Sequence, residues 1–264
     1  MWITLGAWLA LSLDVRLPVH LPVLHQRRGV VHRRGHHPRP ADSRSLMPDA
    51  VPHVFLQGMP MFGGALTMVL GALVAGNGYG WGTWKTLFSQ GVRRTPAVLG
   101  SMTALTIFVL ATLLVTLGFD LAVSLIITAA EGQDVVMPSA GDVVQAFGAG
   151  FLVLEMWALL GFALGTLARG PALSVGLGLV WALVVENLLR GVGRLLDWVD
   201  ALTAVLPGTS AGSLIGSIIG TGDGDGTPGV LDTVGGGQAT ATVAVYVALA
   251  VVLSVVLVRR RDVA

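Results

Sequence analysis

The sequence predicts an all-α fold: a polytopic integral membrane helical bundle with about five full spans and an atypical N-terminus. Charged residues make up 12% of the 264 residues and hydrophobic residues 53%, whereas a soluble domain carries about 25% charged residues. The apolar residues are also gathered in runs of roughly 20, the length that crosses a bilayer as a helix. These runs do not alternate apolar with polar residues, which excludes a transmembrane β-barrel.

Five segments are long and apolar enough to span a membrane: residues 59–76, a helix within 98–128, then 144–168, 171–189 and 239–258. Several are rich in small residues, such as Gly63-Gly64-Ala65 in the first, which let membrane helices approach each other closely. The second run is interrupted only by Asp120. We expect Asp120 to lie near the outer end of its span, where water can solvate the carboxylate.

The short loops predict the orientation, because Lys and Arg are enriched in cytoplasmic loops. Basic residues follow the first, third and last spans, and if the spans alternate in direction, all of them lie on the same side of the membrane. They are Lys85, Arg93, Arg94, Arg169, Arg259, Arg260 and Arg261. The loop 131–142 is acidic and has no Lys or Arg. We therefore expect a cytoplasmic C-terminus. We expect the outer segment 187–238 to begin with an amphipathic stretch at the interface, residues 190–206, and to continue as a glycine-rich loop.

Residues 1–58 are expected to form a basic N-terminal segment, separate from a transmembrane domain over residues 59–264. Residues 15–44 hold seven Arg, five His and four Pro, with no helical or strand periodicity. Three interpretations stay open: a metal site at His32, His36 and His37, a disordered basic tail, or a segment read in a shifted frame of GC-rich DNA. The neighbouring Arg residues and Pro38 disfavour the metal site. An intact apolar helix in another reading frame would support the third interpretation.

The chain lacks the residues of the common catalytic and metal sites. There is no cysteine, and all six His lie at or before His53, outside the predicted spans. The spans therefore lack the Ser–His pair or zinc ligands of an intramembrane protease, and Asp120 has no second Asp beside it in a span. No Gly-x-x-x-x-Gly-Lys-Ser/Thr phosphate-binding motif is present, and the glycine-rich residues 220–226 are interpreted as a flexible loop. We expect no enzymatic activity, no cofactor and no metal.

Two carboxyl groups inside the predicted spans are candidate site residues, because a charge in hydrocarbon is costly and often functional. Glu155 lies near the middle of the third span, where it could line a pathway, hydrogen-bond across a dimer, or hydrogen-bond to a neighbouring helix of the same chain. Glu186 precedes Arg190 by four residues, which favours an ion pair along one helix.

The most informative segment follows the first span. A turn with three glycines leads into an amphipathic stretch in which Trp84, Leu87 and Phe88 stand beside Lys85 and basic residues further on. Tryptophan and basic residues together indicate an element lying at the membrane interface on the cytoplasmic side.

This segment resembles the cytoplasmic loop of permease subunits of ATP-binding-cassette exporters, in the type-2 permease family and especially its small actinobacterial members. The matching residues are Tyr79, Gly82, Thr83, Trp84, Lys85, Thr86, Leu87 and Arg94. The likeness covers roughly residues 59–264 and continues through 157–169, the small residues of the fourth span, 186–189 and the basic tail. Gly78 stands where the family has an acidic residue, and the family's first helix is not found in residues 1–50.

The resemblance implies a permease of the bacterial plasma membrane that does no chemistry itself. It would form a translocation pathway with a second permease subunit, as a homodimer or a heterodimer, and would bind a separate cytoplasmic ATPase but no nucleic acid. The ATPase-coupling loop that it implies comprises Tyr79, Gly82, Thr83, Trp84, Lys85, Arg93 and Arg94. The alternative is an ATPase-independent secondary transporter or channel, which would show repeats or broken spans with polar residues at mid-depth.

Overall fold

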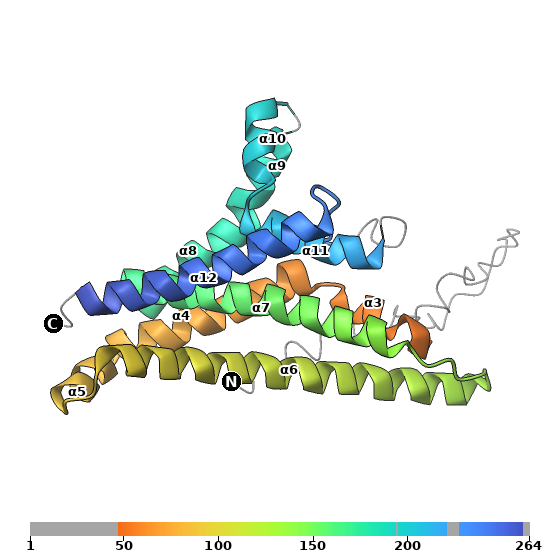
Figure 1. The fold of residues 1–264 in the computed structure, drawn as a ribbon, viewed down its shortest axis with the longest axis horizontal. Coiled ribbons are helices and arrows are strands. Elements are labelled where there is room, and N and C mark those ends of the chain that lie inside the picture. Colours follow the sequence, from red (N-terminus) through yellow and green to blue (C-terminus); the bar gives the residue numbers. More distant parts are fainter. Residues whose placement is uncertain (1–46, 194, 221–226, 261–264) are drawn as a thin grey trace, which may run out of the picture.

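The computed structural model describes residues 47–193, 195–220 and 227–260, and these residues fold as a bundle of helices without strands (Figure 1). Five of the helices are long and apolar enough to cross a membrane: Met59–Gly80, Arg94–Glu131, Ala140–Ala168, Pro171–Gly193 and Gly236–Arg260. The predictions of an all-α fold and of a multi-pass membrane protein are confirmed.

The helices follow one another in this order: η1 (Pro48–Ala50), α3 (Val51–Leu56), the π-helical turn η2 (Met59–Gly63), α4 (Gly64–Gly80), α5 (Thr83–Ser89), α6 (Arg94–Glu131), α7 (Ala140–Ala168), α8 (Pro171–Leu179), the π-helical turn η3 (Val180–Val185), α9 (Glu186–Gly193), α10 (Asp197–Thr203), α11 (Pro207–Ile219) and α12 (Gly236–Arg260). The first span joins η2 to α4, and the fourth joins α8, η3 and α9.

The pair formed by α4 and α7 is the centre of the bundle. A methyl group added at Gly71 of α4 would collide with the carbonyl oxygen of Ala158, and one added at Gly161 of α7 would collide with the carbonyl oxygen of Met68. The two backbones therefore touch where both helices lack side chains, as small residues allow in membranes. Helix α7 also packs against α12, α8, α6 and α3, so most of the bundle is assembled around it.

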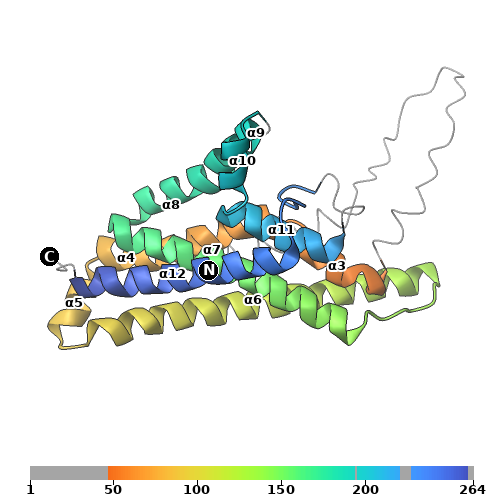
Figure 2. The same ribbon diagram turned by 45° about the horizontal axis from the view of Figure 1, so that its top comes forward.

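Helix α6 lies along the outside of this core (Figures 1 and 2). Its 38 residues are about 57 Å long at 1.5 Å per residue, well beyond a hydrocarbon layer of about 30 Å. Asp120 belongs to a row of polar residues at four-residue spacing on its inner face, with Thr116 and Ser124. Asp120 is only 2% exposed, so the expectation of a solvated carboxylate is wrong, because this row of α6 turns toward the protein.

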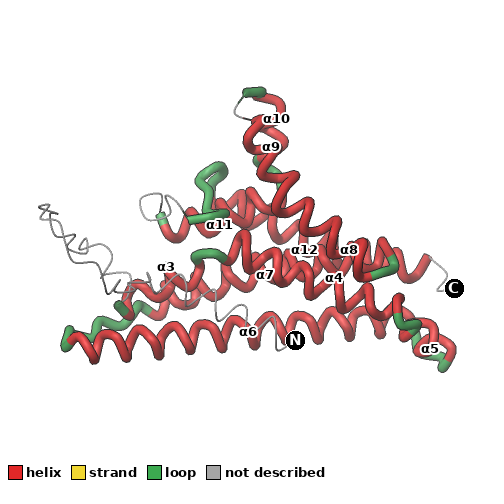
Figure 3. Tube along the Cα trace, turned by 180° about the vertical axis from the view of Figure 1, so that it is seen from behind, coloured by secondary structure: helices red, strands yellow, loops and turns green. Residues whose placement is uncertain are grey.

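The segment after the fourth span differs most from its prediction. Residues 207–219, expected as part of a loop, form α11, which begins with Pro207 as its first residue and packs against α12 and α7. Helices α10 and α11 are bent by 72° at the short break between them, which is the geometry of a broken span or a re-entrant loop. Helices α9 and α10 project away from the rest of the bundle (Figures 1 and 3). Of the predicted interfacial residues on this projection, Leu195 and Trp198 are exposed, whereas Val199 is buried.

Basic residues gather at one end of the bundle, where α5 and the C-terminal end of α12 lie together (Figure 1). Nη1 of Arg94 donates a hydrogen bond to the carbonyl oxygen of Val258 at 3.4 Å, and Nε of Arg259 donates to Thr95 Oγ1 at 2.8 Å. The start of α8 at Pro171, next to Arg169, lies against Gly76 near the end of α4. The three basic loops that we expect on one side of the membrane are thus at one end of the bundle.

Residues 47–58, which we expect in the N-terminal segment, are helical and packed into the bundle. Val51, Phe55 and Leu56 of α3 are buried, and α3 contacts α7 and α6. The packed part of the chain therefore includes residues 48–56 of the predicted N-terminal segment. Residues 1–46, with the His-rich stretch and its three interpretations, lie outside the described residues, as do residues 221–226 of the predicted glycine-rich loop.

The α4–α7 contact gives a direct test of the fold. Gly161→Ala should destabilise the purified protein by about 1–3 kcal/mol, because the new methyl group meets the backbone of Met68. Gly118→Ala on α6 is the matched control: its methyl group would meet no atom within 4 Å, and alanine favours helix. Thermal unfolding in detergent, followed by size-exclusion chromatography, measures both. Equal midpoints for the two variants would contradict this account of the core.

Candidate functional site

Helix α5 is set at the end of α4 by a tight reversal of the chain. The Trp81 N–H donates to the carbonyl oxygen of Asn77 at 2.9 Å, and the Gly82 N–H donates to that of Tyr79 at 3.1 Å. Gly82 has a φ of 68°, a left-handed conformation that residues with a side chain rarely adopt. The glycine therefore ends one helix and starts the next within two residues.

Trp84 anchors α5 to α4. Its side chain is 7% exposed, and its Nε1 donates to the carbonyl oxygen of Ala75 at 3.3 Å. A side chain at position 78 would collide with the indole ring, so glycine is required beneath it. This contact gives a packing reason for glycine at position 78, because the indole ring of Trp84 fills the space beside it.

A row of aromatic rings extends this anchor across α5 to the start of α6. The rings of Tyr79 and Trp84 lie 6.3 Å apart between centroids, and those of Trp84 and Phe88 are stacked at 5.6 Å. The guanidinium carbon of Arg94 lies 5.8 Å from the Phe88 ring centroid, within the range of a cation–π interaction. Helix α5 is thus fixed both to the helix before it and to the helix after it.

The predicted coupling residues divide into two groups. Tyr79, Gly82, Trp84 and Arg94 make the turn, the aromatic row and the contact with α12, so they hold α5 in place. The remaining residues of the prediction are exposed and form what we call the α5 surface: Thr83, Lys85 and Arg93. The sequence predicted the segment as a whole, but it did not show which of its residues hold α5 in place and which are exposed.

Glu155 joins α7 to α6. Its Oε1 lies 2.6 Å from Thr106 Oγ1, and the same hydroxyl lies 3.1 Å from the carbonyl oxygen of Met102. Its Oε2 is buried without a hydrogen-bond partner. Of the roles expected for Glu155, this contact provides the hydrogen bond to a neighbouring helix.

Glu186 is completely buried where the fourth span meets α11. Its Oε1 accepts a hydrogen bond from Trp181 Nε1 at 3.0 Å, and its Oε2 lies against Gly208 in the first turn of α11. Arg190 donates to Asn187 Oδ1 at 2.8 Å and also attracts the Glu186 carboxylate electrostatically, so the predicted pairing along the helix is one of several interactions at Glu186. The carboxyl group turns inward to the N-terminus of a helix, where negative charge is favoured, and this helix was not predicted from the sequence.

Thr209 and Ser210, in the same first turn of α11, are also fully buried, and their hydroxyl oxygens have no hydrogen-bond partner. Among the described residues, no group of His, Cys, Asp and Glu is arranged to hold a metal ion.

No protein-family model, no curated protein and no solved structure matches the chain.

The anchor of α5 predicts a change in protease sensitivity. Trp84→Ala should release α5, because truncating a buried tryptophan removes contacts on the order of 3–5 kcal/mol. Trypsin should then cut faster after Lys85 and Arg93 in the detergent-solubilised protein. Trp81→Ala is the matched control, since Trp81 lies in the neighbouring turn and is 80% exposed. Unchanged cleavage in the Trp84 variant would contradict the anchor.

The bond between α6 and α7 predicts coupling between two positions. Glu155→Leu and Thr106→Val should each lower stability, and the double variant should lose less than the sum of the two. The expected coupling is about 0.6–2 kcal/mol, the range for hydrogen bonds between membrane helices. A double-mutant cycle on thermal or denaturant unfolding measures it, and strictly additive losses would show that the two side chains do not interact.

Proposed function

We propose that the chain is a permease subunit of an ATP-binding-cassette exporter, driven by a separate cytoplasmic ATPase that binds the α5 surface. The observation that carries this proposal is the way α5 is held. It is a short helix at the basic end of the bundle, fixed to α4 through Trp84 and to α6 through Phe88 and Arg94. A partner that moved α5 would therefore move the first two spans with it.

The charge of the α5 surface supports the kind of partner. Lys85 and Arg93 are exposed, and the described residues 81–95 contain no acidic side chain. An acidic patch on the ATPase would complement this surface and steer its association. The chain's own lack of a phosphate-binding motif fits a division of labour in which the ATPase is a separate subunit.

The proposed orientation follows from the same end of the bundle. Loops rich in Lys and Arg remain in the cytoplasm, so the end with α5 and the C-terminus of α12 would be cytoplasmic. The membrane would be the bacterial plasma membrane, where the ATPase has access to ATP.

A second permease subunit is also part of the proposal. The fourth span and the projection that follows it expose many apolar side chains, among them Leu173, Val180, Val184 and Leu188. These residues form one face of a helix that packs on the bundle only along its other side. A second copy, or a related permease, would cover this face and enclose the pathway between the two subunits.

A specific observation favours the alternative, an ATPase-independent secondary transporter. The break between α10 and α11 and the π-helical turn η3 both lie next to the buried Glu186. Broken helices around a polar group are typical of secondary transporters. In that case, the carboxyl group of Glu186 would take part in ion coupling, and α5 would only anchor the chain at the interface.

Charge reversal of the α5 surface tests the proposal. The full chain would be co-expressed with a candidate ATP-binding-cassette ATPase from the same genome, and the complex purified in detergent. Lys85→Glu combined with Arg93→Glu should lower recovery of the complex and its ATPase activity at least about tenfold, because like charges then face each other. Arg260→Glu is the control, since Arg260 is exposed at the same end but outside α5.

Equal losses in the control would show that α5 is not the docking element. A folded, inserted chain that forms no complex with the ATPase would contradict the exporter proposal. Uptake or release by vesicles that contain the chain alone, abolished by Glu186→Gln, would support the secondary transporter instead.

A further inference from the structure

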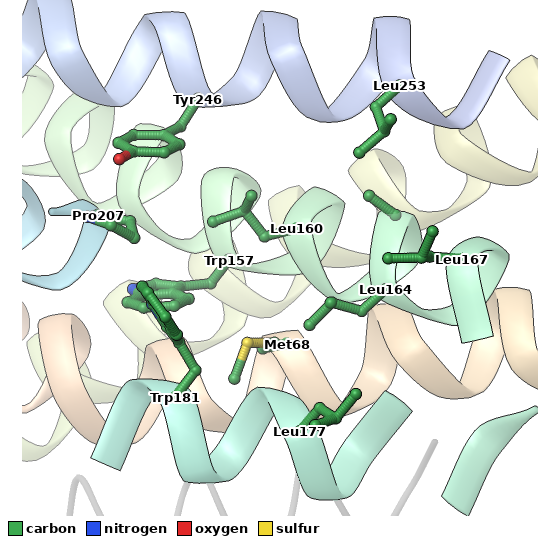
Figure 4. A pocket seen from close by; sticks show the side chains of 11 residues that line it. Met68, Trp157, Leu160, Leu164, Leu167, Leu177, Trp181, Pro207, Tyr246 and Leu253 are labelled. Carbon is green, nitrogen blue, oxygen red and sulfur yellow. The ribbon is translucent and has the colours of Figure 1, made fainter. Parts of the chain in front are cut away.

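A pocket of about 430 Å³ lies between α8 and α12, on the side of the bundle away from α6 (Figure 4). Helix α7 forms most of its floor, with Met68 of α4 beside it. Its lining is almost entirely apolar: Met68, Trp157, Leu160, Ala163, Leu164, Leu167, Leu177, Trp181, Pro207, Tyr246 and Leu253. The volume and the apolar lining are those of a binding site for a small ligand, which usually measures about 300–1,000 Å³.

The pocket opens toward the hydrocarbon region of the membrane. The floor residues Met68, Trp157 and Ala163 are buried, whereas Leu177 of α8 is 51% exposed and Leu253 of α12 is 45% exposed. The rim thus consists of apolar side chains on two spanning helices. A ligand would reach the floor from the bilayer, between α8 and α12, without crossing a polar surface.

One polar group in the pocket is left without a partner. Trp157 is 2% exposed, and its Nε1 makes no hydrogen bond within the described part of the chain. Figure 4 shows this nitrogen at the end of the pocket where Trp181 and Pro207 lie. Leaving a buried N–H unpaired costs on the order of 1–3 kcal/mol, so a hydrogen-bond acceptor at this point would be stabilised.

The neighbouring polar groups of the pocket have already used their hydrogens. Trp181 Nε1 donates to Glu186 Oε1 at 3.0 Å, and the Tyr246 hydroxyl donates to the carbonyl oxygen of Val205 at 2.9 Å. Trp157 is therefore the one lining residue that offers an unused donor. The indole ring is fixed in this position because Gly64 leaves it room: a side chain there would collide with Cδ1 and Nε1 of the ring.

We propose that this pocket binds an amphiphile with one alkyl chain and a hydrogen-bond acceptor on its polar group, taken from the bilayer. The acceptor meets the N–H of Trp157, and the chain lies along Leu160, Leu164 and Leu177 toward the basic end of the bundle. The pocket and the unpaired N–H both lie within a single chain, so this proposal does not depend on the proposed coupling to an ATPase.

Photolabelling of the full chain in lipid nanodiscs tests the site. Two probes of equal length carry a diazirine on the alkyl chain: a twelve-carbon alcohol and the corresponding alkane. The alcohol should label peptides containing Leu160, Leu177 and Leu253, and excess unlabelled dodecanol should compete. Trp157→Phe keeps an aromatic ring but removes the N–H, so it should weaken the alcohol about 2–10-fold, the effect of one hydrogen bond, and leave the alkane nearly unchanged.

Filling the pocket provides the second variant. Ala163→Phe should reduce labelling of these peptides by both probes, whereas Leu114→Phe, on the lipid-facing side of α6, should not. Thermal unfolding confirms that the variants are folded. Equal labelling by the alcohol in the wild type and in Trp157→Phe would overturn the role of the N–H. Undiminished labelling in a folded Ala163→Phe variant would overturn the site.

The natural occupant is either a membrane lipid or a free amphiphile, and native mass spectrometry separates the two. A single-chain lipid that is retained through purification in mild detergent and lost in Ala163→Phe assigns the pocket to a resident lipid. If the pocket purifies empty, and added dodecanol fills it in the wild type but not in Ala163→Phe, the occupant is a free amphiphile. A wild-type chain that retains no lipid and takes up no dodecanol contradicts the proposal.

Discussion

The direct contact between the backbones of α4 and α7 is the interaction on which the rest of the structure depends. Apolar side chains gain little by leaving lipid for a protein interior, so membrane helices must associate through close packing and hydrogen bonds. Gly71 and Gly161 provide that packing here, since each faces a backbone carbonyl group of the other helix. Helix α4 carries α5 at its end, and α7 carries Glu155 and Trp157. The positions of all the candidate site residues on these helices are therefore set by this one contact.

Two buried carboxyl groups join helices of the bundle. Glu155 links the outer helix α6 to α7, and Glu186 links the fourth span to the first turn of α11. In a bilayer, no water competes for these contacts, so a buried donor or acceptor that lacks a partner is costly. The unpaired N–H of Trp157 is such a group, and it occurs where the helices leave space for a ligand. At this place an unpaired polar group lies beside a space between the helices.

Helix α5 shows how a short helix at the end of a bundle can be held in place and still present charge. The aromatic side chains face inward to α4 and α6, and the free cations face outward. Arg94 is a cation that also takes part in packing: its guanidinium lies over the Phe88 ring and donates a hydrogen bond to the carbonyl oxygen of Val258 on α12. Two spanning helices, α6 and α12, and the short helix α5 therefore meet at this one residue at the basic end.

The sequence by itself determined the five spans, the all-α class, the clustering of basic loops at one end and the segment that contains α5. Run length and charge composition report directly on the cost of placing residues in hydrocarbon, so these features can be read without a structure. The sequence did not determine α11, because residues 207–219 are rich in small residues and serine, and such a segment is helical only when neighbours bury it. Only the tertiary structure decided that Asp120 faces inward, that Glu186 meets Gly208, and that Trp157 lines a pocket. Each of these depends on how helices rotate and approach one another, and that is fixed by contacts between residues far apart in the chain.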